Sequence, residues 1–141
     1  MSTHGVIAKN DPDGGWIGRY HHFDSYPSGL GIALLDAYDH FDHDPDQMIA
    51  YLIDGEPVGW YTIVGVDWNS PKGWNERVGR GEPFGPQSYS ERGETEPVDP
   101  EGEWIYVIMP TGLQVHHACT GRTALVGWGD RDRMRSLEAM P

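Results

Sequence analysis

A change of hydrophobic spacing in the first third of the chain constrains the fold most. Residues 16–22 alternate between two faces of a strand: Trp16, Gly18, Tyr20 and His22 on one, Ile17, Arg19 and His21 on the other. Beyond this segment the apolar residues recur at spacings of four, four and three, a pattern that predicts an amphipathic helix: Leu30, Leu34, Tyr38 and Phe41. A strand must therefore lead directly into a helix through a corner formed by residues 20–31.

The corner carries the densest set of potential contact groups in the chain, Tyr-His-His-Phe-Asp-Ser-Tyr-Pro-Ser-Gly-Leu-Gly. The first backbone N–H groups of a helix lack internal partners and carry partial positive charge, so such a corner can hold an anion. The predicted ligand-binding residues are Arg19, His22, Asp24, Tyr26, Ser28, Gly29 and Gly31. Their chemistry suits a phosphate or a nucleotide-like compound, and it equally suits a tight structural turn in which a histidine ties strand to loop.

Two β-hairpins are predicted, one at each end of the chain. Residues 6–8 and 16–22 flank a turn rich in Pro, Asp and Gly, and residues 104–109 and 113–118 flank Pro110-Thr111-Gly112. Further strands are predicted over residues 56–66 and 123–128.

Two shorter helices are predicted as well. Asp44 is placed as an N-cap, with Pro45 at the first helical position and Gln47 completing a capping box, so that a helix runs to about Ile53. The spacing of Met134 and Leu137 predicts a terminal helix within residues 130–140.

These elements predict a single α+β domain over residues 1–141. Its sheet is mostly antiparallel, built from two hairpins plus an extra strand, and it carries two or three helices. Residues 67–102 are rich in Gly, Pro and Glu, which predicts an irregular excursion.

The charge balance is strongly acidic. Acidic residues number 22 against 10 basic ones, giving a formal net charge of −12, which disfavours ordinary DNA or RNA binding. Residues 21–71 contain no Lys or Arg, so an acidic face is expected. This face either serves solubility or imitates nucleic acid to capture a basic protein, and in the second case the predicted protein-contact residues are Asp42, Asp44 and Asp46.

The expected compartment is the cytoplasm. Cys119 is the only cysteine, so no internal disulfide can form. The chain has no apolar run long enough to cross a bilayer, and its first residues lack the features of a secretion signal.

No metal and no cofactor are predicted. Histidine and aspartate are frequent around residues 21–24, 40–44 and 116–117, but no zinc or calcium spacing pattern occurs among them. Nucleophilic roles for Ser2 or Cys119 lack any supporting motif.

The corner also resembles a segment of small proteins from bacteriophages, prophages and actinobacteria. Those proteins begin with Thr-Arg-Gly or Thr-Arg-Ser and continue with Tyr-x-His-(Trp or Phe)-Asp-(Gly or Ser)-Tyr-Pro, then a glycine and an amphipathic helix. The matching residues are Thr3, Gly5, Tyr20, His22, Phe23, Asp24, Ser25, Tyr26, Pro27 and Gly31. His4 stands where that family usually has Arg, so a permanent cation is replaced by a group whose charge depends on pH.

The resemblance implies a phage-type accessory protein for host takeover or anti-defence, acting in the host cytoplasm. Such a protein is expected to bind a nucleotide-like signal or a basic host protein stoichiometrically. The alternative is a small hydrolase or transferase acting on a phosphate-containing metabolite. In that case His22 is the general base, oriented by Asp24, and backbone amides of the corner stabilise developing negative charge.

Overall fold

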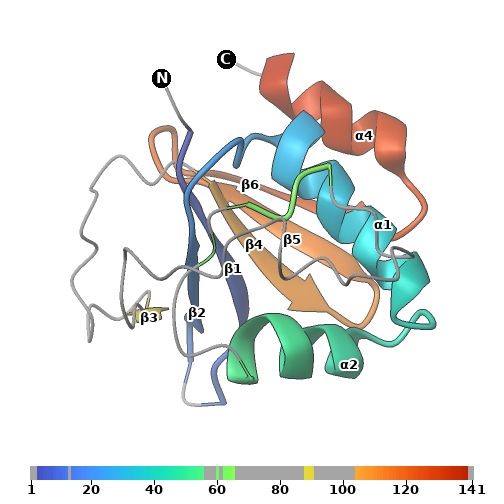
Figure 1. Ribbon diagram of the computed structural model, residues 1–141. Helices are drawn as coiled ribbons and strands as arrows, with labels where there is room; N and C mark the ends of the chain where they lie inside the picture. The colour runs from blue at the N-terminus through green and yellow to red at the C-terminus, as the bar shows by residue number, and fades with distance from the viewer. Residues whose placement is uncertain are drawn as a thin grey trace.

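The computed structural model describes residues 3–12, 14–55, 60, 62–65, 88–90 and 104–139 as a sheet with helices packed on one face (Figure 1). The strands are β1 (Gly5–Asn10), β2 (Trp16–His21), β3 (Ser88–Ser90), β4 (Trp104–Met109), β5 (Gly112–His117) and β6 (Arg122–Gly127). The helices are η1 (Pro27–Gly31), α1 (Ile32–His40), α2 (Pro45–Ile49), η2 (Ala50–Asp54), α4 (Arg131–Ser136) and η4 (Leu137–Ala139). The α+β fold class predicted from the sequence is confirmed.

The sheet has the strand order β3-β2-β1-β4-β5-β6. Each neighbouring pair is antiparallel except β1 and β4, which run parallel in the centre. Both predicted hairpins are present, as β1–β2 and β4–β5, and β6 confirms the strand predicted over residues 123–128. The sheet is therefore mostly antiparallel, as expected.

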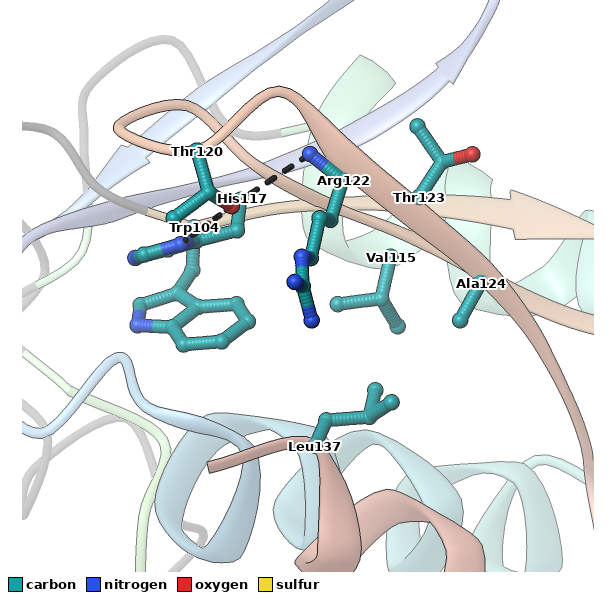
Figure 2. A pocket seen from close by; sticks show the side chains of 8 residues that line it. All are labelled: Trp104, Val115, His117, Thr120, Arg122, Thr123, Ala124 and Leu137. Carbon is teal, nitrogen blue, oxygen red and sulfur yellow. Dashed lines mark hydrogen bonds between the residues drawn. The ribbon is translucent and has the colours of Figure 1, made fainter. Parts of the chain in front are cut away.

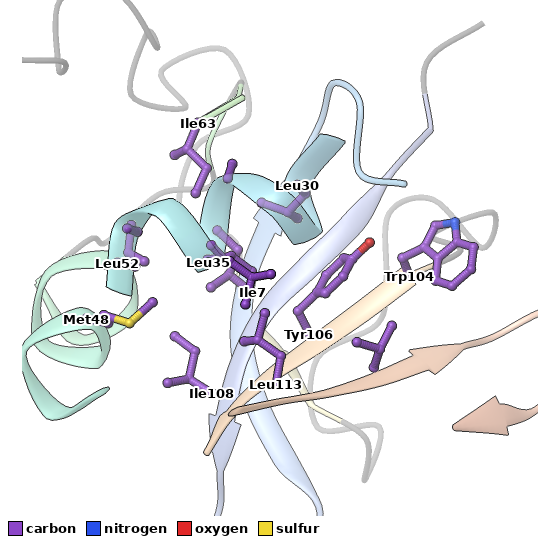
Figure 3. Packing of buried hydrophobic residues seen from close by; sticks show 14 of the residues in the cluster. Ile7, Leu30, Leu35, Met48, Leu52, Ile63, Trp104, Tyr106, Ile108 and Leu113 are labelled. Atoms are coloured by element: carbon purple, nitrogen blue, oxygen red, sulfur yellow. The ribbon is translucent and has the colours of Figure 1, made fainter. Parts of the chain in front are cut away.

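The main core lies between the helices and one face of the sheet (Figure 3). Central strands contribute Ile7 and Tyr106, which are fully buried, while α1 contributes Leu34 and Leu35. The other sheet face buries a smaller cluster of Val6, Ala8, Tyr20, Ile105 and Val107. The alternation predicted for β2 is confirmed, because Tyr20 pairs with Val6 of the second cluster and Arg19 pairs with Ile7 of the first.

The first predicted helix is present, but only part of its apolar face is fully buried. Leu30 lies in η1, a single π-helical turn that leads into α1, and both Leu30 and Leu34 are fully buried. Tyr38 and Phe41 are half-buried at the edge of the core, where Tyr38 stacks on Trp128 with ring centroids 4.3 Å apart. No helix among the described residues is long and apolar enough to span a membrane.

The second helix begins as the sequence predicts. The Asp44 carboxylate accepts from the backbone N–H groups of Asp46 and Gln47, so Asp44 is the N-cap of α2. In a capping box the Gln47 side chain would also accept from the Asp44 backbone N–H. Here the Gln47 side-chain amide instead donates to the Asp44 carboxylate at 3.2 Å. The Asp44 backbone N–H is instead bonded to the Phe41 carbonyl, which leaves that amide satisfied by the preceding turn.

The strand predicted over residues 56–66 is not found where the structure describes this segment. Trp60 forms an isolated parallel bridge with His21, and residues 64–65 form a turn. The Trp60 backbone pairs with Tyr20 and His22, and its indole N–H donates to the Leu52 carbonyl. Trp60 thus bonds to both β2 and η2. Its side chain packs in the core, and its backbone forms a single bridge and no continuous strand.

Most of the predicted excursion at residues 67–102 lies outside the described residues. Its described part is β3, which adds an edge strand beside β2.

A close backbone contact at Gly18 gives the first prediction. A Cβ atom on Gly18 would collide with the Ile7 carbonyl oxygen in the neighbouring strand, whereas one on Gly127 of β6 would meet nothing within 4 Å. Gly18→Ala is therefore expected to destabilise the protein by about 1–3 kcal/mol, because backbone atoms cannot move aside as a flexible side chain does. Gly127→Ala, the matched control in another strand, should leave the unfolding midpoint in urea nearly unchanged. Equal midpoints for the two variants would contradict this account of the β1–β2 contact.

Candidate functional site

The corner between β2 and α1 is fixed by its own backbone. Asp24 adopts a left-handed conformation with φ 59°, which aspartate tolerates better than most residues. The Asp24 carbonyl then accepts from the Leu30 N–H at 2.9 Å, and the Tyr26 carbonyl accepts from the Gly29 N–H at 2.9 Å. The Gly29 amide, one of those expected to face a ligand, is thus bonded within the corner.

A third amide of the corner is bonded to a carboxylate of the same chain. The Ser28 N–H donates to Glu138 Oε1 at 2.6 Å, which brings the terminal helix η4 against η1. A side chain at Gly31 would meet Met134 Sδ at 2.5 Å, so glycine here permits α4 to pack closely. Gly29 likewise leaves no room for a Cβ beside the Asp24 carbonyl. The anion position at the Ser28 amide is taken by Glu138.

His21, not His22, is the histidine that ties strand to loop. It is fully buried, and its Nδ1 lies 2.9 Å from Ser25 Oγ, which itself donates to the His21 carbonyl at 3.0 Å. The Ile63 backbone N–H donates to His21 Nε2 at 3.0 Å. Because the Ser25 proton is committed to the carbonyl, Nδ1 must carry the imidazole proton and Nε2 must be the acceptor. Ser25 is held further, because its carbonyl accepts from the buried Tyr106 hydroxyl at 2.6 Å.

This arrangement keeps His21 neutral. Burial lowers the pKa of His21 to about 3, with a further lowering from the charge of His22. Its two ring nitrogens are both engaged, so His21 offers no lone pair to a metal or a substrate.

His22 lies on the opposite side of the strand, in a ring cluster with His4, Tyr20 and Phe23. The His4 and His22 rings stack with centroids 4.5 Å apart and an interplanar angle of 20°, and the Tyr20 hydroxyl lies 2.7 Å from His22 Nδ1. Phe23 packs edge-on against His22 and is 39% exposed. Partial burial, and then the charge of His4, lower the pKa of His22.

Asp24 contacts Tyr26, whereas His22 contacts the Tyr20 hydroxyl. The Asp24 charge, then burial, then a hydrogen bond from the phenol to Asp24 raise the pKa of Tyr26. Arg19 shares the sheet face of Ile7, opposite to Tyr20, so the strand separates the Arg19 side chain from His22. The corner residues therefore divide into separate groups and do not converge on one ligand.

The acidic residues after α1 play different roles. Asp36 and Asp39 pair with Arg131 of α4, at 2.6 Å and 3.6 Å, so part of the acidic face is neutralised from within. Asp44 is occupied as the cap of α2. Asp42 and Asp46 are exposed, and neither forms an ion pair with another described residue.

An open hollow that the sequence did not reveal is lined by residues that neighbour Asp42 and Asp46 in the chain. It has a volume of about 310 Å³ and is lined by Phe41, Gln47, Ala50 and Tyr51. The Phe41 and Tyr51 rings lie 5.4 Å apart and are tilted by 46°. The helical spacing assigned Phe41 to the core, yet its position at the end of α1 leaves the ring half-buried beside α2. Where the structure describes side chains, no group of three or more His, Cys, Asp and Glu residues suits a metal ion.

Comparison with protein-family models, with curated proteins and with solved structures finds no match to this chain.

The depressed pKa of His21 predicts a pH dependence of stability. The unfolded chain binds a proton at the ordinary histidine pKa of about 6.5, while the folded chain binds it only near pH 3. The His21 contribution is therefore complete above pH 6.5 and is lost as the pH falls toward 3, by up to about 1.4 kcal/mol per pH unit.

The measurement compares urea unfolding of the wild type and His21→Gln between pH 7.5 and 4.5. Glutamine does not titrate, so the free energy of unfolding should fall less with acid in His21→Gln than in the wild type, although the variant is weaker at neutral pH. Parallel pH profiles for the two proteins would show that His21 is not held neutral.

The left-handed backbone of Asp24 gives a separate prediction. Asn shares the tolerance of Asp for this conformation, so Asp24→Asn should shift the unfolding free energy by less than about 0.5 kcal/mol. Asp24→Val should cost about 1–3 kcal/mol, because a β-branched residue is strained at positive φ. Urea titration of both variants checks this, and a large loss in Asp24→Asn would instead indicate a structural role for the carboxylate.

Proposed function

We propose that this chain is a phage-type accessory protein that acts by stoichiometric binding of a basic host protein. The binding surface is the acidic hollow, defined as the hollow of Phe41, Gln47, Ala50 and Tyr51 together with the carboxylates of Asp42 and Asp46. The observation that carries the proposal is that two lining residues of this hollow, Phe41 and Gln47, each adjoin in sequence an exposed aspartate without an ion pair among the described residues.

Helical spacing places Asp46 beside a residue that lines the hollow. Asp46 precedes Ala50 by four residues, and Gln47 precedes Tyr51 by four, so each pair lies one turn apart on α2 and η2. Asp42 follows Phe41 directly and has φ 57° in the turn after α1. An Arg or Lys side chain placed in the hollow would contact the ring faces with its stem or cation and the carboxylates with its charge.

The contacts at the corner between β2 and α1 favour a basic protein as the partner and disfavour a phosphate ligand. The Ser28 N–H, one of the backbone donors expected to face an anion, is bonded to Glu138, and the Asp24 and Glu138 charges both act on Tyr26. A phosphate group approaching this place would meet two carboxylates, whereas a cationic side chain would be attracted.

The net charge of the whole chain also favours a basic partner. A net charge of −12 attracts basic surfaces over a distance set by the ionic strength. The phage-type origin and the site of action in the host cytoplasm rest on the resemblance of the residue 20–31 segment.

The test begins with capture of partners from an actinobacterial lysate, followed by titration of the purified partner against this protein. We expect a basic partner, a 1:1 complex, and weaker binding at higher salt. Replacing both Asp42 and Asp46 with Asn should weaken binding about tenfold, since exposed ion pairs contribute about 0.2–1 kcal/mol each. Asp132→Asn, which removes an exposed carboxylate from α4, is the charge control and should leave the affinity unchanged.

Two results would overturn the proposal. One is equal affinity for the wild type and the Asp42→Asn/Asp46→Asn double variant. The other is a small-molecule activity: intact nucleotide released in equimolar amount on denaturation would indicate sequestration, and converted product in excess of protein would indicate an enzyme.

A further inference from the structure

At the other end of the sheet, three side chains of different chemistry form one row across three strands. Trp104 of β4 pairs with His117 of β5, which pairs with Arg122 of β6. Directly paired residues point to the same face, so an indole, an imidazole and a guanidinium stand side by side. The Trp104 and His117 rings are 4.2 Å apart.

A pocket opens beside this row because the next row is smaller. That row runs from Tyr106 through Val115 to Ala124, and the short alanine side chain on β6 leaves space under Arg122. Leu137 of η4 closes the far side. The pocket is small. The space inside it that a water molecule can reach is about 20 Å³, and the wider volume of about 290 Å³ includes open solvent at its mouth. Figure 2 shows the Arg122 side chain extending into this space toward Leu137.

The loop between β5 and β6 holds the polar rim in place. Thr120 Oγ1 lies 2.9 Å from His117 Nδ1 and accepts from the Arg122 backbone N–H at 3.3 Å (Figure 2). The hydroxyl thus links two members of the row. Among the described residues the Arg122 guanidinium has no ion pair, although the chain carries more than twice as many acidic as basic residues.

We propose that this pocket binds a small organic carboxylate that carries an apolar group. Arg122 provides the planar donor geometry that matches a carboxylate in two parallel hydrogen bonds. One carboxylate oxygen fits the space that water can reach, and the apolar side chains at the open mouth, Val115, Ala124 and Leu137 with the Trp104 ring, would contact the rest of the ligand. This site is separate from the acidic hollow and carries the opposite charge, so it does not depend on the proposed function.

The test uses benzoate as the probe and follows backbone amide shifts by NMR during titration. We expect saturable shifts at Val115, Arg122, Ala124 and Leu137. Benzamide, which has the same ring without the charge, should bind at least tenfold more weakly. Arg122→Gln should weaken benzoate binding at least tenfold, and Ala124→Leu should abolish it by filling the pocket.

Arg135→Gln is the matched control, since it removes an exposed arginine of α4 that does not line the pocket. Three results would overturn the proposal: benzoate shifts that survive in Arg122→Gln, equal loss in Arg135→Gln, or saturable binding of inorganic phosphate as strong as that of benzoate. A peptide with a free apolar C-terminus tests the second source of the same chemistry. Tight binding of the peptide, lost on C-terminal amidation, would assign the carboxylate to a protein tail, and binding of benzoate alone would assign it to a free acid.

Discussion

The structure depends on a buried histidine that must stay neutral. His21 joins four segments of the chain, because it bonds to Ser25 in the corner and to Ile63 beyond the helices, while Ser25 is tied to Tyr106 of β4. An imidazole that donates at one nitrogen and accepts at the other satisfies two buried groups that water cannot reach. A protonated ring would lose the acceptor for the Ile63 N–H, so the network tolerates one tautomer and one charge state.

This network gives the residues of the corner structural roles in place of the ligand-binding roles predicted from the sequence. Ser25 and Gly31 hold the chain in place, Asp24 supplies a left-handed turn, and Glu138 fills the position that an anionic ligand would take. The local sequence therefore encodes a junction between strand and helix. The two binding surfaces that we propose lie elsewhere and carry opposite charge: the acidic hollow near α2, and the pocket under Arg122.

Local patterns predicted the secondary structure well, because they act over a few residues. Alternation placed Arg19 and Tyr20 on opposite faces correctly, and the Asp44 cap was recognised from residue types alone. The sites were harder to predict from the sequence, since they depend on how strands and helices pack together in space. No local pattern shows that Arg122 of β6 shares a row with Trp104 of β4, and the two adjacent histidines look alike in sequence although only His21 faces the core. The strand predicted around Trp60 was wrong where described, because its backbone and indole bond to several elements.

The most direct measurement of the central claim is the protonation state of His21 by long-range ¹H–¹⁵N NMR across a pH titration. The structure predicts a neutral ring with its proton on Nδ1 and no titration down to about pH 4, since the pKa of His21 is about 3. The Ile63 amide proton should exchange slowly over the same range. A proton on Nε2, or titration near the ordinary histidine pKa, would contradict the account.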